Sequence, residues 1–379
     1  MSNFTLYSRK PINSNKIDMP FLIVCIILLS LGIVTLFTST NGQDSFFRDP
    51  MYFVIHQLEA IAIGFVFMLF LICVNMDTIR KILPILFFVT LGMCILTAIP
   101  GIGYESNGAR RWIKFGFFSF QPSEGAKFVL VIYLANLYAK KIDNGEEASN
   151  SWYHALIGII VFVLTVIAQR DFSTAMFLLF LGITISFLVG VKLRYFLMLL
   201  VMGIPIIFLL IFTEEYRVQR IIGFFHPTFD VQGVNYQLTA AKSAISSGGF
   251  IGKGISGLSK IHLIPEVQAD FLFAGWAEAM GFIGVLFYFG LLVFFMWRVV
   301  IIALHVKDSF CAYAAFGSGL CIVMQSLVNT AVVCGAFPST GIPLPFFSAG
   351  GSAMIITLCF NGLIINISRK SLARDGDYE

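Results

Sequence analysis

The segment His262-Leu-Ile-Pro-Glu-Val-Gln-Ala-Asp270 ends a long polar stretch and leads directly into the apolar run 271–297. The polar stretch begins at Glu214, and nearly all the rest of the chain consists of apolar runs of helix length. Because backbone inside a bilayer must satisfy its own hydrogen bonds, an irregular segment of this length belongs at the membrane surface. We therefore predict that functional groups gather at this boundary, where carboxylates precede a span.

The composition indicates an all-α, polytopic membrane protein. Of the 379 residues, 58% are hydrophobic and only 12% are charged. Apolar stretches of about 18 or more residues recur, and each can cross a hydrocarbon core of roughly 30 Å. The net charge of +4 is too small to suggest a nucleic-acid partner. The seven cysteines form no CxxC pair, which favours a packing role over a metal centre.

About ten transmembrane helices fit the hydropathy pattern within a single domain, residues 1–379. The predicted spans are 19–37, 53–74, 82–99, 124–139, 154–168, 172–189, 196–212, 271–297, 310–336 and 352–367. A large loop, 213–270, precedes the eighth span. A segment rich in proline and glycine precedes the tenth, and we expect it to be non-helical and re-entrant.

The distribution of positive charge predicts the orientation in the membrane. With the N-terminus inside, 14 of the 25 Lys and Arg residues fall on cytoplasmic segments. Both termini, 1–18 and 368–379, are then cytoplasmic, and the loop 213–270 is extracytoplasmic.

One short outer loop is unexpectedly basic. It carries Arg110, Arg111 and Lys114, and Lys127 follows one turn into the next helix. Cations on this side oppose the usual topology signal, so an anionic head group is a natural ligand for them. The alternative is that they are ordinary interfacial residues that anchor the helix ends.

Further outward-facing polar groups come from three other segments. Glu124 and Lys127 share a helix face at i, i+3, and Ser123 is a plausible N-cap ahead of them. Asp171 lies at a charged hairpin tip, where it either serves the site or caps the next helix. Glu278 lies two turns into the helix that follows Asp270.

These motifs, taken in order, resemble the SEDS family (shape, elongation, division and sporulation proteins), of which FtsW, RodA and SpoVE are members. The resemblance spans nearly the whole chain. It rests on GARRWI at 108–113, QPSE with Lys127 at 121–127, LIPE and DF around Asp270, and TGIPLPFFSAGGS at 340–352. Two departures are Gln268-Ala269, where members commonly have His-Thr, and Glu278-Ala279, where they commonly have two acidic residues.

The resemblance implies an inverting peptidoglycan glycosyltransferase that polymerises lipid II at the outer face of the bacterial cytoplasmic membrane. It places the essential aspartate at Asp270. The substrate-binding residues that we assign in the matching motifs and beside them are Arg110, Arg111, Trp112, Glu124, Lys127, Asp171, Pro265, Glu266 and Ser348. It also implies a class B penicillin-binding protein as partner, alongside other division or elongation proteins. Details such as Asn361 favour the division type, FtsW, over the elongation type.

The expected chemistry is reasonable without the resemblance. Pyrophosphate is a good leaving group, so one carboxylate acting as base on the acceptor hydroxyl suffices. Arg110, Arg111 and Lys127 would stabilise the charge that develops on the pyrophosphate. A divalent cation such as Mg²⁺ could share that task, although no ligand cluster in the sequence demands one. For Asp270 the alternative is a helix N-cap ahead of Phe271.

Two other functions fit the same spans. A lipid II flippase would use charged groups and a broken segment within the membrane, but the ionisable residues cluster at the outer edge instead. A non-catalytic scaffold of a division complex needs no chemistry at Asp270, so loss of activity on replacing that residue would exclude it.

Overall fold

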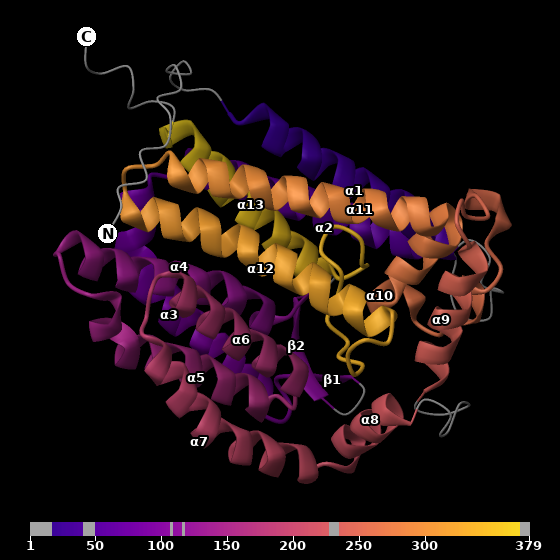
Figure 1. Ribbon diagram of the computed structural model, residues 1–379, viewed down its shortest axis with the longest axis horizontal. Coiled ribbons are helices and arrows are strands. Elements are labelled where there is room, and N and C mark those ends of the chain that lie inside the picture. The colour runs from indigo at the N-terminus through magenta and orange to yellow at the C-terminus, as the bar shows by residue number, and fades with distance from the viewer. Residues whose placement is uncertain (1–16, 41–49, 107–108, 116–117, 227–234, 372–379) are drawn as a thin grey trace.

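The computed structural model describes residues 17–40, 50–106, 109–115, 118–226 and 235–371. The expected cytoplasmic segments 1–18 and 368–379 therefore lie mostly outside the described residues. Their innermost residues are described, and the backbone N–H of Asp18 donates to Ser368 Oγ at 3.4 Å. The first and last spans thus begin and end close together (Figure 1).

Each predicted span contains a helix. These helices are α1 (Met19–Thr40), α2 (Pro50–Cys73), α3 (Met76–Ala98), α4 (Pro122–Asp143), α5 (Trp152–Ala168), α6 (Phe172–Leu188), α7 (Leu193–Phe212), α11 (Leu272–Leu304), α12 (Ser309–Val333) and α13 (Gly351–Ser371). Among the described residues, eight helices are long and apolar enough to cross a membrane. Of the other two, α6 has 17 residues and α4 carries several charges. The protein is an all-α, multi-pass membrane protein.

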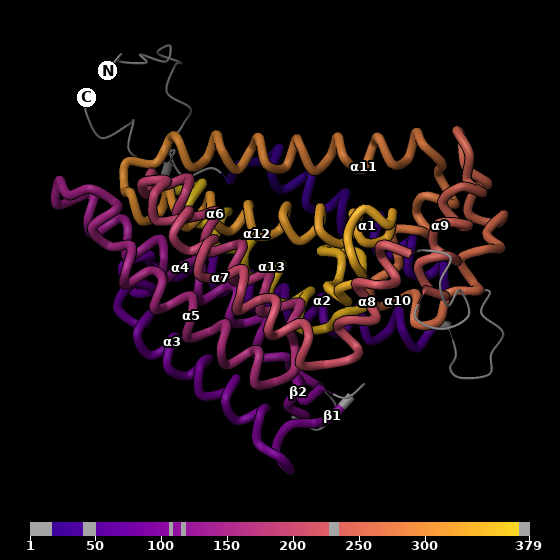
Figure 2. Tube along the Cα trace, turned by 60° about the horizontal axis from the view of Figure 1, so that its bottom comes forward, coloured from indigo at the N-terminus to yellow at the C-terminus, as the bar shows by residue number. Residues whose placement is uncertain are grey.

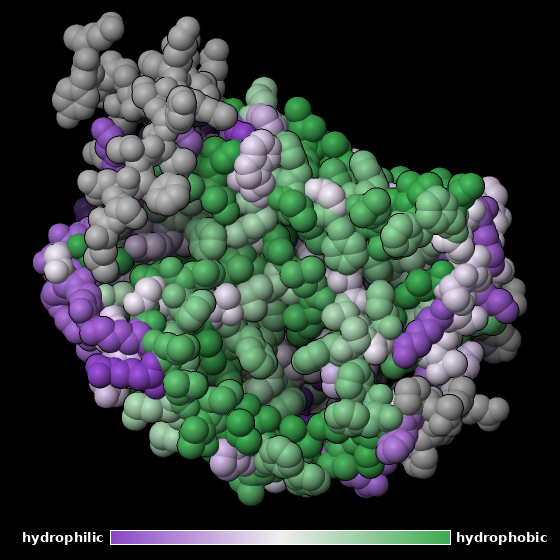
Figure 3. All heavy atoms as spheres, in the orientation of Figure 1, coloured by the Kyte–Doolittle hydropathy of each residue, from purple (hydrophilic) through white to green (hydrophobic). Residues whose placement is uncertain are grey.

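The helices pack in pairs around α13. This helix contacts α2 and α12, α12 contacts α4 and α11, and α5 contacts α6, as the crossing tubes of Figure 2 show. Hydrophobic residues cover most of the visible surface between two hydrophilic ends in Figure 3. One of these ends holds the start of α1 and the end of α13, and the other holds α9 (Figure 1). A belt of this kind is expected of a protein surrounded by lipid.

The large loop 213–270 is more ordered than the prediction of an irregular segment allowed. It contains the helices α8 (Glu215–Phe225), α9 (Tyr236–Gly248) and α10 (Val267–Asp270), with the 3₁₀ turns η2 (Ile255–Gly257) and η3 (Ile261–Leu263). A further turn, η1 (Ala148–Ser151), precedes α5. The prediction of irregular backbone was therefore wrong, because short amphipathic helices also satisfy backbone groups at a membrane surface.

A small antiparallel sheet follows α3, and it was not predicted. Its strands are β1 (Tyr104–Ser106), β2 (Ala109–Phe115) and β3 (Phe118–Phe120), in the order β1-β2-β3. β2 turns successive side chains to opposite faces, which sends Arg111 one way and its neighbours Arg110 and Trp112 the other. The basic loop thus forms a three-stranded sheet.

The helix α11 is broken at Gly281, whose φ of 62° interrupts the helical backbone. The turn before η2 wraps over the break: Phe282 N donates to Gly249 O at 3.0 Å and Lys253 N to Glu278 O at 3.1 Å. The sequence 248–253 lacks the spacing of a nucleotide-binding loop, and its glycines shape this turn instead.

The proline- and glycine-rich segment 338–350, which we call the central loop, is non-helical, as predicted. Amide side chains hold it from the surrounding helices. Gln57 of α2 donates to Ser348 O at 3.0 Å, and on α12 Gln325 donates to Pro343 O at 2.9 Å. The central loop is therefore packed inside protein, where irregular backbone can be satisfied.

Candidate active site

Asp270 ends the short helix α10, one residue before the N-cap of α11. That N-cap is Phe271, so the alternative in which Asp270 caps the helix is wrong. Asn329 of α12 donates to Asp270 O at 2.7 Å and to Ile342 O at 2.8 Å, which joins α10 to the central loop. A Cβ built on Gly341 would lie 3.8 Å from Asp270 Oδ2, so the carboxylate faces the loop at a residue that has no side chain.

The carboxyl group of Asp270 has an altered acidity. Burial raises its pKa from 3.8 to about 6, the nearby Arg220 guanidinium opposes the rise, and Glu266 adds to it. Desolvation disfavours the charged form of an acid, whereas an adjacent cation favours it. A carboxylate whose pKa is close to neutrality suits a general base.

Arg220 is the functional residue that the sequence analysis missed. It lies on α8, and its Nη1 donates to Ser339 O, at the start of the central loop, at 2.8 Å. Burial lowers the pKa of its guanidinium to about 10, and the charges of Asp270 and Asp171 oppose this. The group still carries a full positive charge at neutral pH. The available signal was a pair of arginines, Arg217 and Arg220, three residues apart in a polar stretch.

Arg111 and Asp171 meet at the same site. Arg111 Nη1 lies 3.7 Å from Asp171 Oδ2, and the charges of both reach Arg220. Asp171 is also the N-cap of α6, since its Oδ1 accepts from Thr174 N at 3.2 Å, so its capping role is confirmed. Among the described residues, Arg111 Nε has no hydrogen-bond partner although it is buried. The arrangement presents cationic donors beside Asp270.

Glu124 and Lys127 lie in the packed interior. Both are at most 3% exposed, and Lys127 Nζ donates to Glu124 Oε1 at 2.6 Å and to Gln325 Oε1 at 2.8 Å. Gln325 in turn holds the central loop. The lysine ammonium is therefore paired within the protein, and through Gln325 it helps to hold the central loop in place. The expected N-cap Ser123 was wrong, because α4 begins at Pro122 and its N-cap is Gln121.

The remaining predicted residues are more scattered. Arg110 points outward and pairs with Glu105 at 2.9 Å. Pro265 and Glu266 are exposed, and Glu266 has a φ of 51°. Ser348 is buried, and its Oγ accepts from Leu344 N at 2.8 Å, closing a turn of the central loop. Trp112 lines a separate cavity against α2.

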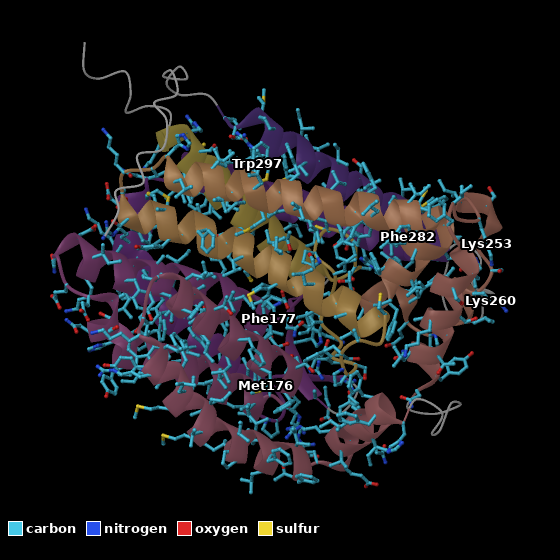
Figure 4. The ribbon with its side chains drawn as sticks, in the orientation of Figure 1. Met176, Phe177, Lys253, Lys260, Phe282 and Trp297 are labelled. Atoms are coloured by element: carbon cyan, nitrogen blue, oxygen red, sulfur yellow. The ribbon has the colours of Figure 1, made fainter. Side chains whose placement is uncertain are left out.

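Glu278 stabilises the segment that leads to α10 rather than the site itself. Its buried carboxylate accepts hydrogen bonds from Lys253 Nζ at 3.1 Å, Lys260 N at 3.0 Å and Ile261 N at 2.8 Å. In Figure 4, Lys253 and Lys260 lie at the end of the molecule beyond α9, and Trp297 lies farther back along α11. Glu278 therefore fastens the segment leading to α10, which positions Asp270 indirectly.

Comparison with known proteins decides the family. The family model described as cell cycle protein, which covers FtsW, RodA and SpoVE, matches residues 19–372. The chain belongs to the FtsW/RodA/SpoVE family. This family is the one to which the sequence motifs pointed, so the resemblance is confirmed.

Curated relatives within the FtsW/RodA/SpoVE family cover nearly the whole chain. The probable peptidoglycan glycosyltransferase FtsW of Geobacter sp. strain M18 is 34% identical over 93% of this chain and 97% of its own length. The protein of the same name from Borreliella burgdorferi is 33% identical over 94% and 98%. The stage V sporulation protein E of Bacillus subtilis is 32% identical over 93% and 97%.

Solved structures of this family share the fold. A chain from a structure that shows the coordination of polymerization and crosslinking by a peptidoglycan synthase complex matches with a TM-score of 0.77. It is 25% identical and covers 93% of this chain and 98% of its own. The rod shape determining protein RodA of Thermus thermophilus matches with a TM-score of 0.69 at 25% identity, over 93% and 97%.

Proposed function

We propose that this protein is a peptidoglycan glycosyltransferase that polymerises lipid II into glycan strands at the outer face of the cytoplasmic membrane. One observation carries the assignment: Asp270 has a pKa raised to about 6 and faces the central loop beside the cation Arg220. The relatives named peptidoglycan glycosyltransferase FtsW, with about one residue in three identical along the chain, supply the reaction class.

The site residues divide the reaction between them. Asp270 accepts the proton of the acceptor 4-hydroxyl while that oxygen bonds to the donor sugar C1. The bond from C1 to the pyrophosphate oxygen breaks, the leaving group takes the electron pair, and the configuration at C1 inverts. Arg220 and Arg111 face the charge that develops on the pyrophosphate. Arg110 is exposed and could only guide the substrate in.

A divalent cation such as Mg²⁺ is compatible with these groups. The described residues contain no group of three or more His, Cys, Asp or Glu that could hold a metal. Mg²⁺ commonly uses one or two carboxylates together with substrate phosphates. Glu266, whose charge lies near Asp270, is the carboxylate that would hold it, and the ion would neutralise pyrophosphate charge.

The cellular setting follows from the same relatives. The names FtsW among them support septal wall synthesis in division, with an elongation role as the alternative. The similar chain in a peptidoglycan synthase complex supports a class B penicillin-binding protein as transpeptidase partner, alongside other division or elongation proteins. We place both termini in the cytoplasm of a bacterium and the end that holds α9 outside.

The decisive experiment is polymerisation of labelled lipid II by the purified protein with its transpeptidase partner. We expect strands from the wild type and a loss of about 10²–10⁴-fold in rate for Asp270→Asn. Asp77→Asn, an exposed aspartate at the start of α3, is the matched control and should keep full rate. Equal rates for wild type and Asp270→Asn would remove Asp270 as base. An inactive wild type with bound partner would favour a flippase or a scaffold.

A further inference from the structure

The cavity that Trp112 lines lies beside the far end of the central loop, apart from Arg220. It has a volume of about 560 Å³, and its walls include Gln57 of α2, Trp112 of β2 and Ala349 of the central loop. Arg220 contacts the opposite end of the same loop, at Ser339. The central loop therefore separates a cationic site from this cavity.

Gln57 joins the wall of the cavity to the central loop. Its side chain is 3% exposed, and its Nε2 donates to Ser348 O at 3.0 Å. Its Oε1 is enclosed by protein rather than open to the cavity. Gln57 therefore fixes the position of the central loop beside the cavity.

Two further polar groups face the cavity from the same helix. His56 Nδ1 lies 2.8 Å from Glu59 Oε2, and both side chains are about half exposed, at 44% and 54%. Both line the cavity. Ionisable residues on a membrane helix normally face a water-filled cavity and mark a pathway or site. The pair His56–Glu59 therefore indicates that the cavity is filled with water.

The chemistry of the lining selects a neutral, hydroxylated ligand. Among the described residues that line the cavity there is no Lys or Arg, and Glu59 would repel a phosphate. An indole ring, a carboxylate and an imidazole can together recognise a sugar, because the ring packs on its C–H face while the polar groups bind hydroxyls. The cationic site at Arg220 is the better place for a pyrophosphate.

We propose that this cavity binds N-acetylated sugar units of the glycan substrate, with Glu59 accepting from a hydroxyl or an amide N–H and Trp112 packing on a sugar ring. The assignment rests on the proposed function for its substrate class. It also links occupancy to catalysis, because Gln57 holds Ser348 in the central loop and Gly341 of that loop faces Asp270.

Direct binding tests the proposal without requiring turnover. The probe is chitotetraose, a neutral oligomer of N-acetylglucosamine, added to the full-length protein in nanodiscs and followed by saturation-transfer NMR. We expect binding by the wild type and at least a tenfold weaker affinity for the double variant His56→Ala/Glu59→Ala, since hydrogen bonds to charged groups are at stake. Both residues are exposed, so the fold should tolerate the change. Absence of binding by the wild type, or equal binding by the variant, overturns the proposal.

Polymerisation then identifies which sugars the cavity holds. A raised KM for lipid II in the double variant assigns the cavity to the incoming unit. Shorter strands at an unchanged initial rate assign it to the growing chain. The matched control is Lys141→Ala/Glu146→Ala, an ion pair between the last turn of α4 and the loop that follows it, which should leave KM and strand length unaltered. If wild type binds chitotetraose but makes no strands, the proposed function fails while the cavity assignment stands.

Discussion

Asp270 is held between two opposing influences. Burial favours its neutral acid form, whereas the Arg220 guanidinium favours the carboxylate. The outcome is a pKa of about 6, low enough for the base to be mostly ionised at neutral pH and high enough for it to accept a proton readily. Removing either influence should move the working pH of the enzyme.

The pH dependence of polymerisation should therefore report Asp270. The ionised carboxylate is the active form, so the rate should rise as the pH increases from 5 to 7, with a midpoint at about 6. Arg220→Gln removes the cation that favours ionisation, so its midpoint should shift upward and its maximal rate should also fall. A pH–rate profile of both proteins measures this. A midpoint that stays at the same pH in the variant would contradict the electrostatic coupling.

The raised pKa of Asp270 affects the stability of the fold in the opposite sense to the lowered pKa of a carboxylate in an ordinary ion pair. Because the folded-state pKa lies above the usual 3.8, the folded protein binds the proton more tightly than the unfolded chain does. Stability therefore falls as the pH rises from about 3.8 to about 6, and the charged carboxylate keeps its full cost at higher pH. Asp270→Asn should be no less stable than wild type at pH 7, which separates a catalytic loss from a folding defect.

Among the elements, α11 shows most clearly how glycine permits an irregular connection. A Cβ on Gly281 would lie 2.3 Å from Gly252 N, and one on Gly252 would lie 2.2 Å from Ala279 O. The two backbones approach this closely because neither residue has a side chain. The contact lets the turn before η2 satisfy the N–H and C=O groups that the break in α11 exposes.

Gly281→Ala should destabilise the protein, because φ 62° and ψ −161° form a region that is essentially restricted to glycine. We expect a loss of about 1–3 kcal/mol from the backbone alone, with a further loss from the clash. Gly290→Ala in the same helix is the control, since a Cβ there meets nothing within 4 Å. Thermal unfolding in detergent measures both. Equal melting temperatures for Gly281→Ala and wild type would show that the break is not required.

Element by element, the sequence predicts the long helices better than the site. Apolar runs predict all ten main helices, since burial in lipid requires only length and hydropathy. The strands around Trp112 were missed because three to seven residues give too little alternation to detect. Arg220 was missed because its role depends on α8 folding back onto Ser339, a contact 119 residues away in sequence. Lys127 was predicted to bind the substrate as a cation. Its hydrogen bond to Gln325 was not foreseen, because Gln325 lies on a helix that is distant in sequence.

At the scale of the whole molecule, buried polar groups connect elements that are far apart in sequence. Lys127 joins α4 to α12 through Gln325, and Gln325 joins α12 to the central loop. At the other end, Arg298 of α11 pairs with Asp18, just before α1. Such contacts fix the helices relative to one another where hydrophobic packing against lipid-facing neighbours gives little specificity.

A double-mutant cycle on Glu124 and Lys127 tests whether this pair supports the scaffold. Removing one partner leaves a buried charge, so Glu124→Gln or Lys127→Met should each cost about 3–5 kcal/mol of stability. The double variant should cost less than the sum of the two. The same substitutions in the exposed pair Lys141–Glu146 should leave the stability almost unchanged. Single variants that keep full stability but lose lipid II polymerisation would instead assign the pair to substrate.

The burial of α13 has a consequence for how the protein is made. Of the residues in the most apolar 18-residue stretch of α13, 89% are buried inside the protein, so this helix contacts almost no lipid. It leaves the ribosome after all its neighbours, and α2, which it packs against, was synthesised near the start. Until α13 arrives, the face of α2 that includes the backbone of Met68, against Gly362, has no protein partner. A chain that is stalled or truncated before α13 should therefore expose this face of α2 to membrane chaperones and proteases.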